Sequence, residues 1–179
     1  MMRLALMLRN TLTSSACALT LCLVSTALSV APGCNAGSTA EATVADPHEV
    51  TLDGRTYALE LALTPEQREQ GLSDREEIDP EGGMLFVFPD SQVHVQQFVM
   101  RRCLVPIDII FVAPDGLITA MHAMQVEEPG TTGYELERYG SRYPAQFVIE
   151  LAGGTLETLN LSVGDRVDLP REALAAAAN

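Results

Sequence analysis

The sequence of 179 residues contains no lysine and no tryptophan, and residues 10–40 carry no charge at all. A globular domain does not begin with 31 uncharged residues, so this gap excludes a single folded unit that spans the whole chain. All eleven cationic residues are arginines, and they face 24 acidic residues, which gives a net charge of −13. Because a strongly acidic surface repels phosphate backbones, nucleic-acid binding is disfavoured.

The amino-terminal segment has the pattern of an export signal. Arg3 and Arg9 give it a positive start, and residues 16–31 form an apolar run, ACALTLCLVSTALSVA. A membrane-spanning helix needs about 20 predominantly apolar residues, and this run is shorter and ends at a Pro-Gly pair. We therefore predict a secretory signal over residues 1–33 in preference to a transmembrane anchor.

The end of this segment, Ala31-Pro32-Gly33-Cys34-Asn35, resembles the lipobox of bacterial lipoproteins. The resemblance implies that Cys34 is lipidated and becomes the mature amino terminus. The protein would then be exported to the cell envelope, on the periplasmic or extracellular side, and would touch the membrane only through this lipid. The family usually has a large aliphatic residue where this chain has Ala31. The alternative is ordinary cleavage after residues 29–31, which leaves Cys34 without a role.

The rest of the chain divides by composition. Residues 34–46 are small and polar, which predicts a flexible tether. Residues 47–170 have the length of one domain. The tail over residues 171–179 is rich in alanine, and we expect it to attach loosely to the domain. Without the signal, nine arginines face 24 acidic residues, and this self-repelling charge of −15 favours a monomer. Cys103 is the only cysteine within the domain, so no internal disulfide is possible.

The first part of the domain carries two well-marked local signals. Asp53-Gly54 separates two strand-like runs and predicts a tight hairpin, because this turn needs positive backbone φ angles. Thr64-Pro65, with Gln67 three residues after the threonine, predicts a capped helix that ends at Gly71.

The remaining pattern predicts a mainly β fold. Short strand-like runs cover residues 84–88, 94–100, 107–112, 117–126, 145–151 and 163–167, with a second short helix over 153–159 and a polar loop over 127–143. The strands do not alternate with helices. We therefore expect an antiparallel β-sandwich or half-open, jelly-roll-like barrel with two short helices.

Motifs spread over the domain resemble the DUF192 family, an uncharacterised bacterial and archaeal family. They are Arg68-x-x-Gly71-Leu72, Arg75, Gly83-Met84-Leu85-Phe86-Val87-Phe88, Phe98-x-Met100-Arg101, Pro106-x-Asp108-Ile109-Ile110-Phe111, Asp115-Gly116, Pro144-Ala145, Val148-x-Glu150 and Gly164-Asp165. The resemblance implies a compact β-rich domain, often exported, without an established activity. Relatives usually have Phe-Trp-Met-Lys-Asn-Thr where this chain has residues 98–103 (FVMRRC), so the Trp, Asn and Thr of that stretch are absent here.

Two carboxylates lie in apolar strands. Alternation places Asp108 on one face with Ile110 and Val112, while Glu150 shares a face with Val148. A carboxylate among apolar neighbours needs a partner or a raised pKa. One interpretation is a pair of perturbed acids in a cleft, with Arg68, Arg75 or Arg101 as counter-charges. The other, which we favour, is a structural network of ion pairs or loop amides.

The leading functional hypothesis is a cell-envelope accessory or binding domain that holds a small polar ligand or an envelope protein. Its expected site comprises Arg68, Met100, Arg101, Asp108 and Glu150.

Two alternatives stay open. An enzyme could use Asp108 and Glu150 as general acid and base, an idea that fails if they lie on opposite faces of the sheet. A copper protein could use methionine, histidine and Cys103 as soft ligands, although no ligand pair has the spacing of a metal motif. We expect no cofactor and no metal, because the sequence has no phosphate loop, no Gly-x-Ser-x-Gly and no His-Glu-x-x-His.

Overall fold

The computed structural model describes residues 48–179. The predicted export signal, the tether and the lipidation site Cys34 lie outside these residues. None of the helices in the described part is long and apolar enough to cross a membrane.

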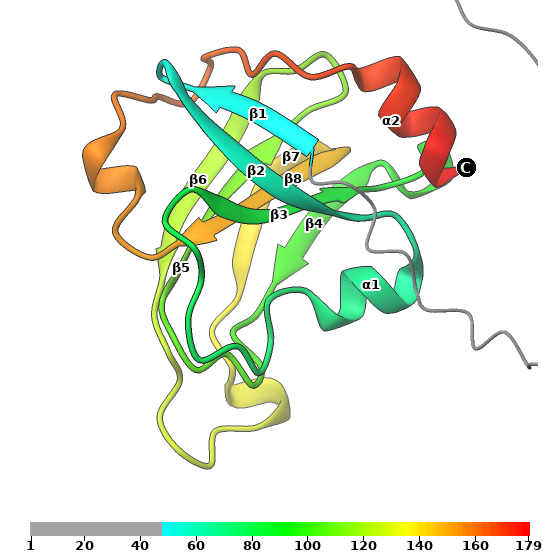
Figure 1. Cartoon of the computed structure of the whole chain (residues 1–179). Coiled ribbons are helices and arrows are strands. Elements are labelled where there is room, and N and C mark those ends of the chain that lie inside the picture. Colours follow the sequence, from blue (N-terminus) through cyan, green and yellow to red (C-terminus); the bar gives the residue numbers. More distant parts are fainter. Residues whose placement is uncertain (1–47) are drawn as a thin grey trace, which may run out of the picture. The chain divides into compact units, whose positions relative to one another are not determined.

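The described residues form eight strands and a few short helices (Figure 1). The strands are β1 (His48–Leu52), β2 (Arg55–Ala62), β3 (Gly82–Val87), β4 (His94–Phe98), β5 (Ile107–Val112), β6 (Ile118–Met124), β7 (Tyr139–Ala145) and β8 (Phe147–Ala152). The helices are α1 (Pro65–Gln70), α2 (Arg171–Ala178) and three 3₁₀ turns, η1 (Asp90–Gln92), η2 (Gly133–Glu135) and η3 (Leu156–Thr158).

Six strands build one mixed sheet in the order β1-β2-β3-β8-β5-β6, and β4 pairs with β7 in a separate two-stranded sheet. All neighbours are antiparallel except β2 and β3, which run parallel. A parallel pair needs a crossover connection, and α1 with the loop that follows it provides that connection. The expected mainly β, open architecture is therefore confirmed, with one parallel pair that the sequence did not indicate.

Both faces of the large sheet are covered by apolar side chains. One face packs against the carboxyl-terminal segment, through Leu159, Val167, Leu169 and Leu174. The other face packs against residues from β4, β7 and the turn that follows β4, among them Phe98, Met100 and Tyr139. Strands buried on both faces have near-continuous apolar sequences, as in β5 (IDIIFV), every residue of which is buried.

The two local signals in the first part of the domain are confirmed. Asp53 and Gly54 have φ angles of 47° and 77° and connect β1 to β2 as an antiparallel hairpin. Thr64 caps α1 with the reciprocal hydrogen bonds of a capping box, because its side chain accepts from the Gln67 amide while the Gln67 side chain accepts from the Thr64 amide. Gly71 ends the helix with a φ angle of 51°.

Four local predictions are wrong. The end of the predicted polar loop, residues 139–143, belongs to strand β7, whose partner is the short strand β4. Its polar, proline-containing sequence fits a small ribbon in which only Tyr139, Ser141 and Ala145 are buried. The predicted strand over 163–167 is reduced to one bridge, between Leu117 and Arg166, and the helix over 153–159 to the single turn η3.

The fourth concerns the tail, which forms α2 and attaches firmly. Leu174 is 5% exposed within the apolar cluster on one face of the sheet, and Ala178 packs against that cluster. The neighbouring arginines also hold this end of the domain, since Arg171 donates to the carbonyl of Pro114 and Arg166 donates to the carbonyl of Asp115. The alanine-rich sequence did not predict this attachment, because Leu174 is the one large apolar residue of the tail that enters the core.

Close packing of β3 against β8 depends on Gly83. A Cβ atom at this position would lie 2.2 Å from the carbonyl oxygen of Glu150, and the φ angle of Gly83 is +146°. Gly54 is a useful contrast, because its φ angle is also positive, at +77°, while a Cβ atom there would meet nothing within 4 Å.

Replacement of Gly83 is therefore expected to damage the sheet. Gly83→Ala should lower the free energy of unfolding by about 4 kcal/mol or more, because the Cβ atom forces β3 away from β8. Gly54→Ala should cost only about 1 kcal/mol, the conformational penalty alone. Urea unfolding of the two variants measures the difference, and equal losses would show that the close approach is unimportant.

Candidate functional site

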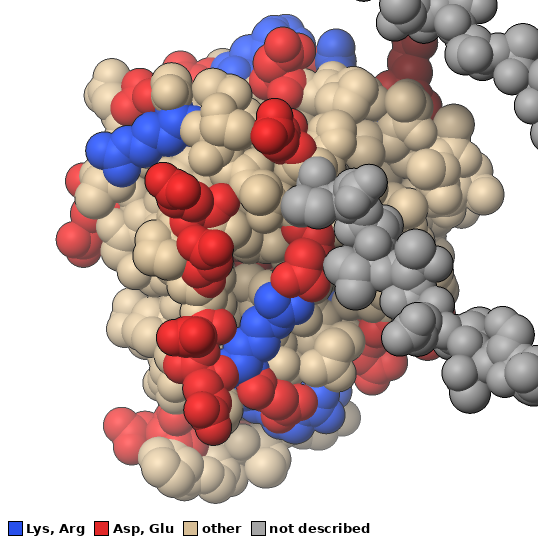
Figure 2. All heavy atoms as spheres, viewed as in Figure 1, with Lys and Arg blue, Asp and Glu red and all other residues tan. Residues whose placement is uncertain are grey.

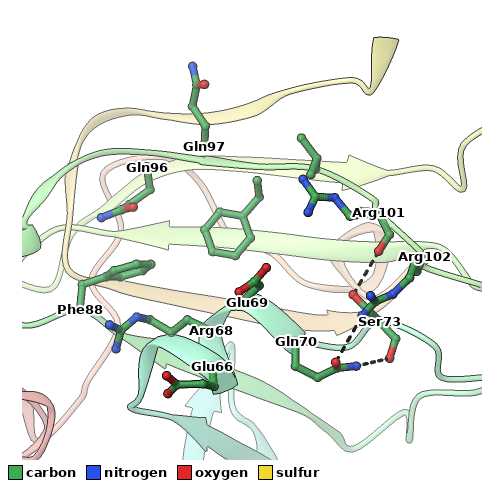
Figure 3. A pocket seen from close by; sticks show the side chains of 12 residues that line it. Glu66, Arg68, Glu69, Gln70, Ser73, Phe88, Gln96, Gln97, Arg101 and Arg102 are labelled. Carbon is green, nitrogen blue, oxygen red and sulfur yellow. Dashed lines mark hydrogen bonds between the residues drawn. The ribbon is translucent and has the colours of Figure 1, made fainter. Parts of the chain in front are cut away.

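A cleft of about 510 Å³ lies between helix α1 and strand β4 (Figure 3). Three arginines, two glutamates, three glutamines and a serine supply its polar wall, and two phenylalanines and a valine supply its apolar wall. The lining residues are Glu66, Arg68, Glu69, Gln70, Ser73, Phe88, Gln96, Gln97, Phe98, Val99, Arg101 and Arg102. Of the residues proposed from the sequence, Arg68 and Arg101 lie in this cleft.

Helix α1 presents one side to the cleft. Glu66, Glu69 and Gln70 are spaced three and four residues apart, so they share a face of the helix. Figure 3 shows the carboxylate of Glu69 pointing up into the cleft, whereas that of Glu66 lies at its lower border. The Glu66 carboxylate also interacts with its own backbone amide and the Thr64 side chain, which lower its pKa.

Arg68 is held by the fold. Its Nη1 donates to the carbonyl oxygens of Leu63 and Val87, and its Nη2 lies 3.3 Å from the Gln92 amide oxygen. Its guanidinium also lies over the ring of Phe88, 5.3 Å from the centroid. These contacts join the ends of β2 and β3 to η1, so Arg68 shapes the cleft wall more than it offers a free charge.

Arg102 is also occupied. It forms an ion pair with Asp74, at 3.1 Å, and its Nη2 lies 3.3 Å from the Gln70 side-chain oxygen. The backbones of the two turns are joined as well, because the Asp74 amide donates to the Arg102 carbonyl and Ser73 donates to the Arg101 carbonyl. Both Asp74 and Arg102 have positive φ angles, 64° and 55°, which this turn-to-turn contact stabilises.

Arg101 differs from the other two arginines of the cleft. The two ion pairs found within residues 48–179 are Arg75–Glu60 and Arg102–Asp74, and neither involves Arg101. Its side chain is exposed and extends into the cleft in Figure 3, opposite helix α1. It is therefore the guanidinium of the cleft that is available to a ligand.

Met100 lies beneath this turn, 1% exposed in the apolar cluster of that face. It also borders a second hollow of about 540 Å³, with a mainly apolar wall that includes Cys103, Leu104, Val126 and Leu136.

Cys103 has a raised thiol pKa. Burial is the largest cause and the charge of Glu150 the second, and together they raise the pKa of the Cys103 thiol to about 11. Since the thiolate is the nucleophile and metal ligand, Cys103 is poorly suited to either role at neutral pH. Among residues 48–179, no group of three or more His, Cys, Asp or Glu side chains is placed to hold a metal ion.

Asp108 does not reach the cleft. Its side chain is 1% exposed, and its Oδ2 accepts a 2.6 Å hydrogen bond from the Leu156 amide. Burial raises its pKa, while the amides of Leu156, Gly154 and Thr155 lower it. Asp108 therefore anchors the loop that follows β8, which is the structural interpretation favoured from the sequence.

Glu150 is buried on the other side of the sheet. Its Oε2 has no hydrogen-bond partner among the described residues, and Gly71 packs against it so closely that a Cβ atom there would lie 3.6 Å from it. Burial raises the pKa of Glu150 to about 8, opposed by the Leu72 amide and the charge of Arg75. Arg75 itself forms its ion pair with Glu60, whose pKa it lowers.

The alternative in which Asp108 and Glu150 act as general acid and base fails, because the two acids lie on opposite faces of the sheet. In the register of β5 with β8, Asp108 pairs with Leu151, and Ile109 pairs with Glu150. Paired residues of neighbouring strands point to the same side, and successive residues point to opposite sides. Asp108 and Glu150 therefore cannot act on one substrate.

Several residues of the cleft were not predicted from the sequence, notably Glu69, Gln70, Gln96 and Arg102. For Glu69 and Gln70 a signal was present, since they share a face of a predicted helix with Glu66. For Gln96 and Arg102 there was none, because their place depends on how β4 and its following turn fold over α1.

Comparisons with known proteins place the domain in a family without an established activity. The family model DUF192, described as Uncharacterized ACR, COG1430, matches residues 48–169. A crystal structure from Sinorhizobium meliloti 1021, provisionally described as a transcription regulator, is 36% identical over 67% of this chain and 89% of its own, with a TM-score of 0.54. A protein of unknown function from Novosphingobium aromaticivorans is 30% identical over 69% of this chain and 84% of its own, with a TM-score of 0.56. No curated protein matches the chain.

The buried carboxyl of Glu150 gives a pH-dependent stability. As pH rises from about 4.5 to about 8, the unfolded chain ionises this group while the folded chain keeps it protonated, so the free energy of unfolding falls. Glu150→Gln should remove this fall, a difference of roughly 3–5 kcal/mol across that range. Denaturant unfolding from pH 4 to 9 tests this, with the exposed Glu77→Gln as control. Parallel profiles for the wild type and Glu150→Gln would contradict the prediction.

Proposed function

The chain belongs to the DUF192 family, for which no activity is established, and we propose, on the geometry of the cleft between α1 and β4, that it binds a small polar ligand there. The cleft volume of about 510 Å³ falls within the range of ~300–1,000 Å³ that is usual for small-molecule sites. Its wall combines convergent polar groups with two phenylalanine rings, the usual composition of such a site.

The observation that carries the proposal is the free guanidinium of Arg101. Residues 48–179 contain nine arginines and 22 acidic residues, and the face drawn in Figure 2 carries acidic side chains widely spread among a few arginines. Of the three arginines that line the cleft, Arg102 pairs with Asp74 and Arg68 donates to backbone carbonyls. Arg101 stays unpaired at the cleft, where it can donate charge-assisted hydrogen bonds to an anionic or hydroxyl-rich ligand.

We do not extend the description of the Sinorhizobium relative as a transcription regulator to this chain. DNA binding gains most of its affinity from cations that neutralise phosphates. With a net charge of −13 over residues 48–179, this domain would be repelled by the phosphate backbone. A small-molecule ligand or a protein partner agrees better with this charge.

The proposed setting is the cell envelope. The export-signal pattern of residues 1–33 and the lipobox-like sequence at Cys34 support a domain that is secreted and tethered by lipid. A tether over residues 34–46 would leave the cleft free to meet ligands near the membrane surface.

Ligand binding can be tested with the purified protein and a panel of small polar molecules that includes sugars, carboxylic acids, amino acids and short peptides. We expect amide resonances around the cleft to shift with at least one of them in isotope-labelled protein. Arg101→Gln should weaken that binding by about tenfold or more, because a charge-assisted hydrogen bond is lost. Arg138→Gln, which removes an exposed arginine outside the cleft, should leave the affinity unchanged.

Two results would contradict this proposal. One is a panel in which no compound shifts cleft resonances, and the other is a ligand whose affinity is the same in Arg101→Gln and in the wild type. Arg68→Gln is a poor test by itself, because Arg68 joins several elements of the fold.

Lipidation has a separate test. Mass spectrometry of the protein isolated from membranes of an expressing bacterium should show Cys34 as the amino-terminal residue with a diacylglycerol-sized addition. Cys34→Ala should release the protein from the membrane fraction. An unmodified amino terminus at any other residue would defeat the proposed anchor while leaving the binding proposal intact.

A further inference from the structure

Two opposite charges face the cleft without a protein partner. Arg101 and Glu69 both line it, from the turn after β4 and from helix α1 respectively. Within residues 48–179 the two ion pairs involve other residues, so Arg101 and Glu69 do not neutralise each other. In Figure 3 the Glu69 carboxylate and the Arg101 guanidinium lie on different walls, with open space between them.

The two other arginines of the cleft are already engaged. Arg68 donates to backbone carbonyls and stacks on Phe88, and Arg102 is paired with Asp74. Glu66 interacts with the amino-terminal end of its own helix. A ligand therefore meets one unpaired cation, Arg101, and an acidic wall on α1 from which the Glu69 carboxylate points into the cleft, with Glu66 at the lower border.

This arrangement discriminates between ligand classes. A ligand with a single negative charge would pair with Arg101, but Glu69 would repel it and would lose hydration water to it. A ligand with a single positive charge would pair with Glu69, but Arg101 would repel it. A neutral sugar would leave both charges without an ionic partner. A molecule that carries both an ammonium and a carboxylate satisfies both groups.

The remaining wall indicates what lies between the two charges of the ligand. Phe88, Phe98 and Val99 form the apolar part of the cleft, and Phe98 is fixed by edge contacts with Phe86 and Phe111 at 5.2 and 5.6 Å between ring centroids. Rigid rings of this kind bind aliphatic or aromatic side chains. The volume of about 510 Å³ fits a ligand larger than one small amino acid.

We propose that the ligand is a zwitterion of about dipeptide size, a short peptide with free amino and carboxyl ends, whose carboxylate binds Arg101 and whose ammonium binds Glu69. This inference rests on the proposed function of the cleft and makes it more specific. Neither side chain is needed for the fold, since both are exposed.

The test compares three probes, leucyl-leucine, its N-acetyl derivative and its C-terminal amide, by titration of isotope-labelled full-length protein. The wild type should bind the free dipeptide at least about fivefold more tightly than either blocked form. Glu69→Gln should lose the preference for the free amine and keep the preference for the carboxylate, and Arg101→Gln should do the reverse. The exposed Glu77→Gln is the matched control and should behave as the wild type.

The outcomes separate the two proposals. Equal binding of free and blocked dipeptides, or an unchanged amine preference in Glu69→Gln, would overturn the zwitterion. A neutral sugar or a simple carboxylic acid that shifts the cleft while all three peptides fail would also overturn it, and the binding function would stand. A cleft that responds to no peptide and to no member of the polar panel would overturn both.

Discussion

Strand β8 lies in the centre of the large sheet, between β3 and β5, and residues 147–151 are buried on both of its faces. Each face therefore needs its own cover, and the domain supplies two. The carboxyl-terminal segment with α2 covers one face, and β4 with β7 covers the other. The close contact between Gly83 and the carbonyl of Glu150 keeps β3 against this strand. Loss of either cover would expose an apolar strand face to water, at a cost proportional to the area uncovered.

This two-sided burial also separates the charged residues by role. Asp108 points to one face and anchors the loop after β8, while Glu150 points to the other, where burial raises its pKa to about 8. Neither reaches the cleft, because the cleft lies above the second cover, between α1 and β4. The two buried acids therefore lie in strands of the sheet. The two groups proposed to meet a ligand, Glu69 and Arg101, lie on helix α1 and on the turn after β4.

Local signals in the sequence predicted local structure well. The Asp53-Gly54 hairpin and the Thr64 capping box are set by residues within a few positions of each other, so no distant contact is needed to recognise them. The predictions failed where an element depends on a distant partner. Strand β7 is a strand only because β4 lies beside it, and the alanine-rich tail is ordered because Leu174 enters the core. For the site, Arg68 and Arg101 were foreseen, whereas Asp108 and Glu150 were correctly judged to be buried but were wrongly placed together.

The mainly β class, the family, the acidic charge and the burial of Asp108 and Glu150 in apolar strands could all be predicted from the sequence. These follow from composition and from the two-residue period of a strand, which are properties of the chain alone. Which arginines of the cleft are free depends on the folded structure. Arg68 and Arg102 are occupied by partners that lie up to 32 residues away, and Arg101 is left open because the turn that carries it packs on Ser73 and Asp74 through its backbone. Contacts between distant segments carry no local signature, so the charge that a ligand meets could be read only from the folded domain.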